Sequence, residues 1–514
     1  MSAAQDDAAS GRRGRSGGLL RLLRHTSNYS AGTLLITLAS IISFPVFTRT
    51  FTVAEYGDLS LINATLGLLV GVGKLGLQKS VVRFHAEIES GKRAGDRRGL
   101  YSTVLFGMLM VGGAVGALSA LAFVAMPSRW WGHDSLRYLL AAISPLVLVR
   151  VVDSAMLNLL RAEQRSGFYS LYTVLRKYLG LGLVLLVLFS VARNLWGFYM
   201  ATLAGETLAL GLLVAHYARQ RLFRPADFSG TLFISMLAYG LPLLVSELSS
   251  LVLNLGGRYI IDFQLGAEAL GAYSAAYNFC DYLQSALTGA FAQAVVPMYL
   301  RMWEGQGRQR TEAFLQQALR YYLMLALPLI AGMAAVAPGL LRLLASDRYA
   351  VAAPLFVYIV GSMLVAGGTP IFSAGIYINK LTKVVMYSVL ATAAVNLVLT
   401  AVLTRSMGIE GAALAMLCTR TLYVAMTVYY GRGTVALRMP WADLCRFGAM
   451  SLLMYEVVTR ALPWSGLLHT AGQIVVGVAL YGALLLLGDR ELRLAAARAW
   501  QARPWRSRPP GSRG

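Results

Sequence analysis

The feature that most constrains the fold is a long series of apolar stretches, each about as long as a membrane-spanning helix. The first, residues 30–47, carries no charge, and a spanning helix needs about 20 such residues. The later stretches are centred near residues 68, 112, 148, 180, 207, 244, 284, 325, 365, 394, 420, 451 and 477. The pattern predicts an all-α polytopic membrane protein with about fourteen transmembrane helices.

The composition and charge exclude several other classes of protein. Hydrophobic residues make up 57% of the 514 residues and charged residues 14%, against about 25% charged residues in soluble proteins. The net charge of +22 could suggest a nucleic-acid partner. With the N-terminus placed in the cytoplasm, however, 30 Lys and Arg residues fall in the segments on that side and eight on the other. Cytoplasmic loops of membrane proteins typically carry an excess of Lys and Arg. We therefore expect both termini to be cytoplasmic and no nucleic-acid partner.

An internal repeat organises the predicted helices. Gly57 and Ser60, near the start of the second stretch, recur as Gly271 and Ser274, 214 residues later. A second pair of similar segments, where the fifth and eleventh stretches begin, has an offset of 218. A period of six helices is even, so both copies cross the membrane in the same direction. We therefore expect two six-helix lobes related by an axis along the membrane normal, with a pathway between them.

The repeat and the charge runs predict how the chain is divided. Both tails are rich in Arg, Gly and Ser; we expect them to be disordered, and such tails can contact anionic lipid. The predicted division is a basic cytoplasmic N-terminal tail (1–27), a first lobe of helices 1–6 (28–224), a second lobe of helices 7–12 (225–433), helices 13 and 14 (434–488) and a basic cytoplasmic C-terminal tail (489–514).

The chain carries no pattern that is typical of an enzyme. Residues 71–76 match the glycine spacing of dinucleotide-binding loops, but they lie inside a predicted span and follow no strand. Helix packing by small residues explains them better. The five histidines form no cluster. We expect no catalytic residue, no metal site and no cofactor.

Five short motifs follow one another in the order seen in a family of bacterial transporters. They are Thr48-Arg49 with Ala54-Glu55-Tyr56-Gly57; Gly73-Lys74-Leu75-Gly76-Leu77; Leu160-Arg161-Ala162-Glu163-Gln164-Arg165; Arg258-Tyr259-Ile260-Ile261 with Gly266 and Gly271-Ala272-Tyr273; and Gly408-Ile409-Glu410-Gly411-Ala412-Ala413. Over about residues 28–430 the chain resembles the Wzx-type O-antigen and capsule repeat-unit flippases, polysaccharide exporters of the multidrug/oligosaccharidyl-lipid/polysaccharide superfamily. It departs from them at Gly257, where the family often has Asp.

The resemblance implies a fold of twelve or fourteen helices in two six-helix lobes. It also implies a substrate, an oligosaccharide on a polyprenyl diphosphate, that is moved from the cytoplasmic to the periplasmic leaflet of a bacterial inner membrane. The expected product pathways are O-antigen, lipopolysaccharide, capsule or exopolysaccharide biosynthesis. The expected partners are the lipid-linked oligosaccharide, membrane lipid, a polysaccharide polymerase and glycosyltransferases.

Two other functions remain open from the sequence. A cation-coupled multidrug antiporter of the same superfamily would need a cavity in which acidic residues dominate. A non-transporting scaffold in envelope polymer synthesis would use its intramembrane charges only as structural pairs.

Charged residues at membrane depth are the candidate site residues, because each costs about 2.5–3.5 kcal/mol to insert. The first lobe is expected to hold four of the five bases and two of the four acids, so its cavity would suit a diphosphate. The candidate ligands of the diphosphate are Lys74, Arg150, Arg176, Lys177 and Arg420, and the acids that could bind a coupling ion or form ion pairs are Asp153, Glu206, Glu247 and Asp281.

Structural roles compete with these assignments. Arg150 and Asp153 lie three residues apart on one helix face and could form an ion pair. The other three acids have no local partner in the sequence, and we expect one of them to pair with Arg420 across helices.

Several bases could instead lie at a membrane boundary. Lys74 and one of the adjacent pair Arg176 and Lys177 could extend to the cytoplasmic surface. Arg49 and Arg258 fall near the outer ends of predicted spans, and we expect both to be ordinary boundary residues.

Overall fold

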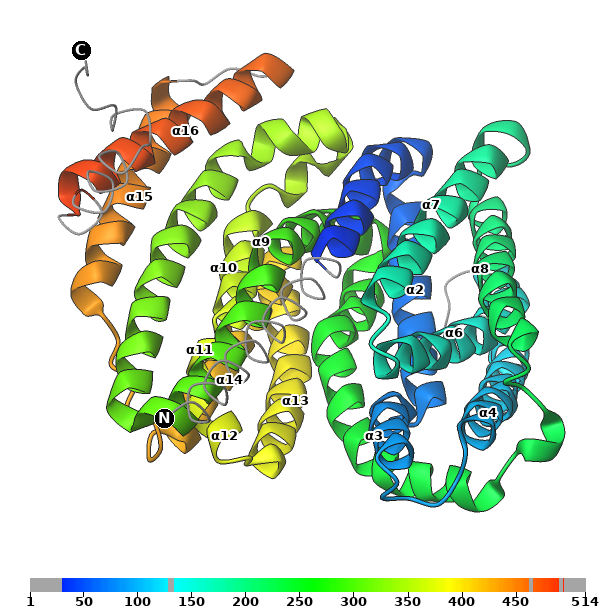
Figure 1. Cartoon of the computed structure of the whole chain (residues 1–514). Coiled ribbons are helices and arrows are strands. Elements are labelled where there is room, and N and C mark those ends of the chain that lie inside the picture. Colours follow the sequence, from blue (N-terminus) through cyan, green and yellow to red (C-terminus); the bar gives the residue numbers. More distant parts are fainter. Residues whose placement is uncertain (1–29, 128–133, 462–465, 490–492, 494–514) are drawn as a thin grey trace, which may run out of the picture.

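The fold was analysed in a computed structural model, which describes residues 30–127, 134–461, 466–489 and 493 (Figure 1). The predictions for residues 1–27, and for residues 490–492 and 494–514 of the C-terminal tail, lie outside this part of the chain. Within the described residues the secondary structure consists of helices joined by turns, without a strand. The predicted all-α class is therefore confirmed.

The helices follow one another with short connections. They are the first helix (Ser30–Thr50), α2 (Val53–Lys74), α3 (Leu77–Glu89), α4 (Arg97–Ala125), α5 (Asp134–Ile143), α6 (Pro145–Ala162), α7 (Ser166–Ser190), α8 (Leu195–Arg219), η2 (Pro225–Asp227), α9 (Gly230–Leu344), η3 (Asp347–Ala352), α10 (Leu355–Gly367), α11 (Thr369–Phe372), α12 (Ala374–Ile378), α13 (Thr382–Met407), α14 (Ile409–Gly431), α15 (Trp441–Ala461) and α16 (Leu467–Gly488). The long α9 has non-helical backbone at Gly266 and Gly307, which divide it into three parts.

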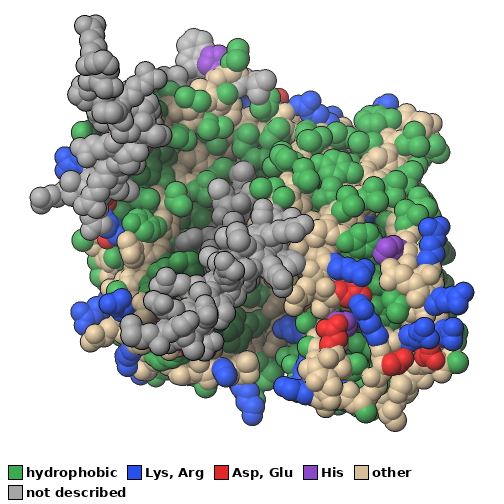
Figure 2. Space-filling view, viewed as in Figure 1, with side chains coloured by type: hydrophobic (Ala, Val, Ile, Leu, Met, Phe, Trp, Pro, Cys, Tyr) green, Lys and Arg blue, Asp and Glu red, His purple; other side chains and the backbone are tan. Residues whose placement is uncertain are grey.

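Among the described residues, twelve helices are long and apolar enough to cross a membrane. Every one of the fourteen predicted stretches falls in a helix. The chain is thus a multi-pass membrane protein, although the count of fourteen spans is not confirmed. Figure 2 shows apolar side chains over much of the visible face and charged side chains gathered towards its lower part, near α3 and α4 in Figure 1.

The interior contains two large hydrophobic clusters. One is formed by residues from Ile62 to Met236 and the other mainly by residues from Ile261 to Val435. Figure 1 shows the corresponding helices as two bundles. The clusters agree with two lobes, whereas the boundary at residues 224/225 stays a prediction.

The start of α2 is fixed by its own sequence. The Thr52 hydroxyl accepts a hydrogen bond from the backbone N–H of Glu55 (3.2 Å), and the Glu55 carboxylate accepts one from the backbone N–H of Thr52 (2.8 Å). This reciprocal capping satisfies two N–H groups that the helix leaves open. Gly57 follows one turn after this start.

Gly57 lies where the lobes meet. A Cβ atom at Gly57 would lie 1.9 Å from the carbonyl oxygen of Ala267, and one at Gly271 would lie 1.9 Å from that of Val53. Any larger residue would push the backbones of α2 and α9 apart. The two predicted repeat glycines therefore form one close helix crossing.

The same crossing carries the second repeated residue. The Ser274 hydroxyl donates to the Ser60 hydroxyl at 2.7 Å. The contact pairs 57–271 and 60–274 advance in the same direction, so α2 and the second part of α9 run parallel here. The contact of Gly57 with Ala267 also has a counterpart in the contact of Gly271 with Val53, in which each residue is exchanged for the one 214 positions away. This reciprocity is what a two-fold axis between parallel repeats produces, and it agrees with the predicted symmetry.

The other end of α2 also contacts α9. The backbone turns through left-handed conformations at Leu75 (φ 48°) and Gly76 (φ 69°), and a Cβ atom at Gly76 would lie 2.1 Å from the carbonyl oxygen of Gly240. In between, Gly71 packs against the side chain of Leu251. The predicted packing role of residues 71–76 is confirmed, and α2 contacts α9 at both of its ends.

Helices α15 and α16 are attached to the second bundle by ion pairs. The buried Asp489 accepts from Arg320 (2.7 Å) and Arg446 (2.8 Å), and Arg446 also contacts Asp443 (2.6 Å). Since Arg320 lies on α9, the pairs tie the two additional helices to the lobe beside them.

The crossing can be tested with a cysteine pair. In a chain whose native cysteines are replaced by alanine, Ser60→Cys with Ser274→Cys should form a disulfide on mild oxidation, because the serine hydroxyls already touch and a disulfide needs Cβ atoms about 3.5–4.5 Å apart. The cross-linked peptides are measured by mass spectrometry before and after reduction.

The matched control is Leu59→Cys with Ser274→Cys, since Leu59 packs on α7 and α8 instead. Equal cross-linking of both pairs, or of neither, would contradict the crossing.

Candidate functional site

Two clusters contain most of the predicted site residues. The first is the first-lobe charge cluster, on α6, α7 and α8, formed by Arg150, Asp153, Arg176, Lys177 and Glu206. All five are predicted site residues, so the structure brings together the candidates of the first lobe except Lys74. Three bases and two acids leave the cluster with one net positive charge.

Arg150 pairs with Glu206 and not with Asp153. Its Nε and Nη2 atoms each lie 2.9 Å from a different Glu206 carboxylate oxygen. This two-point geometry is the strongest that an Arg–carboxylate pair adopts, and it joins α6 to α8. The local pair with Asp153, which the sequence left open, does not form because Arg150 is directed towards α8.

Asp153 has its own partners on α7. Its carboxylate accepts from Arg176 and from the Tyr172 hydroxyl. Among the described residues Lys177 has no ion-pair partner, although it lies near Glu206. The base that is left over in this cluster is therefore Lys177.

Lys74 and Glu247 lie apart from this cluster, at the Gly76 end of α2. Their nearest charged atoms are 3.8 Å apart, and the Gln78 amide also donates to Glu247. The pair joins α2 to α9 across the lobe interface. Because Lys74 is turned towards Glu247, it does not extend freely to the membrane surface, and Glu247 is not available to Arg420.

The second cluster lies where α2, α9 and α14 meet, and we call it the interlobe arginine cluster. It is formed by Asn254, Arg258, Tyr273, Tyr277, Asp281 and Arg420. Asn254 and Arg258 lie one turn apart on α9 and share a face, as do Tyr277 and Asp281 on its second part.

Arg258 is 7% exposed, although the sequence indicated a boundary residue. Its guanidinium donates to the Ser60 hydroxyl (2.9 Å) and to Asn278 (3.4 Å), and it lies 5.3 Å from the centre of the Tyr277 ring. The boundary assignment is wrong because the α2–α9 crossing covers this end of the helix. The Arg258-Tyr259 motif of the family resemblance was the one signal that could have identified it.

Arg420 also has an uncharged partner. It donates to the side-chain oxygen of Asn254, so the expected pairing with an acid is wrong. Within the described part of the chain, Arg258 and Arg420 form no ion pair, and the buried Nε atom of each lacks a hydrogen-bond partner. Asp281 lies near Arg258 but beyond ion-pair distance.

This arrangement suits an anion. A buried charge is costly unless it is paired, and here two guanidinium groups hydrogen-bond to separate uncharged partners, with the Asp281 carboxylate near Arg258. Their N–H groups match the oxygens of a phosphate in pairs. Among the described residues, no group of three or more His, Cys, Asp or Glu side chains could hold a metal ion.

Comparisons with known proteins agree with this fold. The chain is 20% identical to the "Probable low-salt glycan biosynthesis flippase Agl15" of Haloferax volcanii over 80% of its own length and 84% of that protein. It is 21% identical to the "Succinoglycan biosynthesis transport protein ExoT" of Rhizobium meliloti, over 61% of the chain and 60% of that protein. The solved structure of the lipid II flippase MurJ, in an inward closed conformation, superimposes with a TM-score of 0.74 at 16% identity, over 90% of this chain and 99% of that one.

The sequence pattern of one family covers more than half of the chain. The match spans residues 22–303, which include the first lobe, the helix crossing and Arg258. The chain belongs to the polysaccharide biosynthesis protein family.

Proposed function

We propose that this protein is a flippase and not an enzyme, and that it moves an oligosaccharide on a polyprenyl diphosphate from the cytoplasmic to the periplasmic leaflet of a bacterial inner membrane. The repeat unit would then be used for a cell-surface polysaccharide such as O-antigen, capsule or exopolysaccharide. The observation that carries the proposal is the pair formed by the buried Arg258 and the half-buried Arg420, which have no ion-pair partner among the described residues, in a polysaccharide biosynthesis family.

The physical difficulty of the reaction lies in the diphosphate. Its negative charges lose their water when it crosses the hydrocarbon layer, at a cost of several kcal/mol. Arginine stays charged when it loses water, and it binds two phosphate oxygens at once. Arg258 and Arg420 would supply this replacement for water, while the lipid tail stays in the bilayer.

The contacts of α2 suggest how the pathway opens. At the Gly57 end the lobes are held by Ser60 and Ser274, and at the Gly76 end by Lys74 and Glu247. Alternating access needs one contact to open while the other stays closed. Arg258 donates to Ser60, so a diphosphate that takes this guanidinium would release one bond of the Gly57 contact.

The first-lobe charge cluster would contribute in a different way. Arg150 and Arg176 are each held by a carboxylate, which fixes the positions of α6, α7 and α8. Lys177 brings the remaining positive charge. We propose that this cluster provides a second, weaker contact for the diphosphate, formed when an arginine exchanges its carboxylate for a phosphate oxygen.

The orientation and partners are part of the same proposal. Cytoplasmic termini follow from the 30-to-eight distribution of Lys and Arg. A polymerase and glycosyltransferases would use and supply the lipid-linked unit. The multidrug antiporter is less well supported, because neither cluster is dominated by acids.

One prediction of the proposed function concerns Arg258. Arg258→Gln can still bond to Ser60 but lacks the charge, so flipping of a fluorescent polyprenyl-diphosphate oligosaccharide in proteoliposomes should fall by about tenfold or more, given that a charge-assisted hydrogen bond contributes ~1.5–3 kcal/mol. Arg258→Lys should restore it in part. The control is Arg405→Gln, an exposed arginine on α13. Wild-type flipping by folded Arg258→Gln would contradict the role.

A further prediction distinguishes a structural role of Arg150 from a role in substrate binding. Arg150→Gln and Glu206→Gln should each destabilise the protein by about 1–3 kcal/mol, because each leaves a charge without its partner, and the double variant should recover most of this stability. Thermal unfolding and flipping are measured on the same preparations. If the double variant recovers stability but not flipping, Arg150 contacts the substrate; recovery of both would leave a structural pair only.

A further inference from the structure

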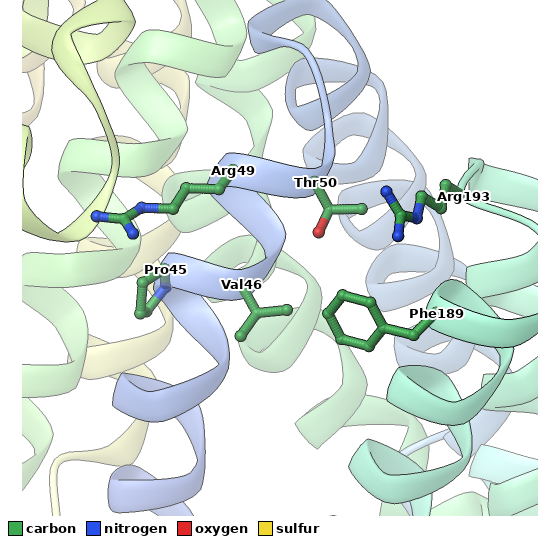
Figure 3. A pocket seen from close by; sticks show the side chains of 6 residues that line it. All are labelled: Pro45, Val46, Arg49, Thr50, Phe189 and Arg193. Carbon is green, nitrogen blue, oxygen red and sulfur yellow. The ribbon is translucent and has the colours of Figure 1, made fainter.

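A pocket opens between the first helix and α7, away from both charge clusters. Its volume is about 360 Å³. Figure 3 shows the side chains around it: Pro45, Val46, Arg49, Thr50, Phe189 and Arg193. It lies where the first helix and α7 end, which is the outer membrane surface in the orientation that the Lys and Arg distribution predicts.

The positive charge of this pocket is not explained by membrane topology. Few Lys and Arg residues fall on the outer side, eight in the predicted distribution, and two of these line this one pocket. Among the described residues neither has a carboxylate partner: Arg49 donates to the Leu343 carbonyl oxygen (2.6 Å), and Arg193 lies 5.9 Å from the centre of the Phe189 ring. In Figure 3, Arg193 points towards Thr50, while Arg49 reaches out on the opposite side. The guanidinium of Arg193 is thus open to an anion.

The rest of the pocket is apolar and continues into the lipid-facing surface. Val46 and Phe189 point towards each other in Figure 3. One turn further into the membrane, on the same helix faces, Ile42 is 60% exposed and Leu186 61% exposed. The site therefore has positive charge at its outer rim and hydrocarbon below it. A lipid with a negatively charged headgroup has the same arrangement.

We propose that this pocket binds the phosphate group of a lipid in the outer leaflet. Arg193 and the Thr50 hydroxyl would contact the phosphate, with Arg49 adding charge at the rim, and the lipid chain would lie along Val46 and Phe189. The lipid is either the carrier diphosphate after it has crossed, an assignment that rests on the proposed function, or an anionic phospholipid. Phosphate recognition rests on the pocket alone.

The test uses a photo-crosslinking amino acid, benzoyl-phenylalanine, in place of Val46 in the purified full chain. Radiolabelled geranylgeranyl diphosphate should be cross-linked in a saturable manner. Combining Arg49→Gln with Arg193→Gln should reduce the cross-linking by about tenfold. The matched control, Arg405→Gln with Arg460→Gln, removes two other outer arginines and should leave it unchanged.

Competition identifies the source of the phosphate. If excess short-chain phosphatidylglycerol fails to compete, the pocket selects the carrier; if it competes equally, the pocket takes anionic phospholipids. Equal cross-linking of geranylgeraniol, which has no phosphate, or no effect of the Arg49/Arg193 double variant would overturn the proposal.

The outcome is separate from that of the flippase itself, because cross-linking needs no transport. Lost cross-linking with normal flipping would remove only the pocket. Retained cross-linking by a chain that flips no oligosaccharide would remove only the proposed function.

Discussion

The rest of the structure depends on the contact between α2 and α9. At Gly57 and Gly271 the two backbones touch, and at Gly76 and Gly240 they touch again. Both contacts need glycine, because any Cβ atom there would collide with a carbonyl oxygen. Helices that approach so closely leave no room for lipid or water between them. The lobes are thus in direct backbone contact at two levels, and Ser60, Ser274 and Arg258, close to the first of them, are buried.

The charged residues of the two clusters differ in how their charges are compensated. In the first lobe, Arg150 and Arg176 meet carboxylates, so their charges are compensated within the protein. At the interface, the hydrogen bonds that Arg258 and Arg420 donate go to hydroxyl and amide groups, and neither arginine forms an ion pair among the described residues. We propose that an anion completes this costly arrangement during function. The diphosphate site that we propose therefore lies between the lobes, closer to the second than the sequence indicated.

The sequence predicted features that depend on periodicity and failed on features that depend on helix rotation. The 214-residue offset correctly indicated that Gly57 and Gly271 occupy equivalent places, because a repeat is visible in one dimension. The partner of a side chain on another helix cannot be identified from the sequence in this way. The Glu206 partner of Arg150 lies 56 residues away, and only the packing of α6 on α8 selects it. Hydropathy indicates how deep a residue lies in the membrane, but it does not indicate which helix packs over that residue. For this reason the sequence predicted a boundary position for Arg258.

The central claim is that the interlobe cluster serves an anionic lipid and not a cationic drug. The most direct measurement compares two activities of the purified protein in the same proteoliposomes: movement of a polyprenyl-diphosphate-linked oligosaccharide between leaflets, and exchange of a cationic drug for protons. We predict protein-dependent movement of the oligosaccharide lipid and no drug exchange. Drug exchange without movement of the lipid would contradict the account.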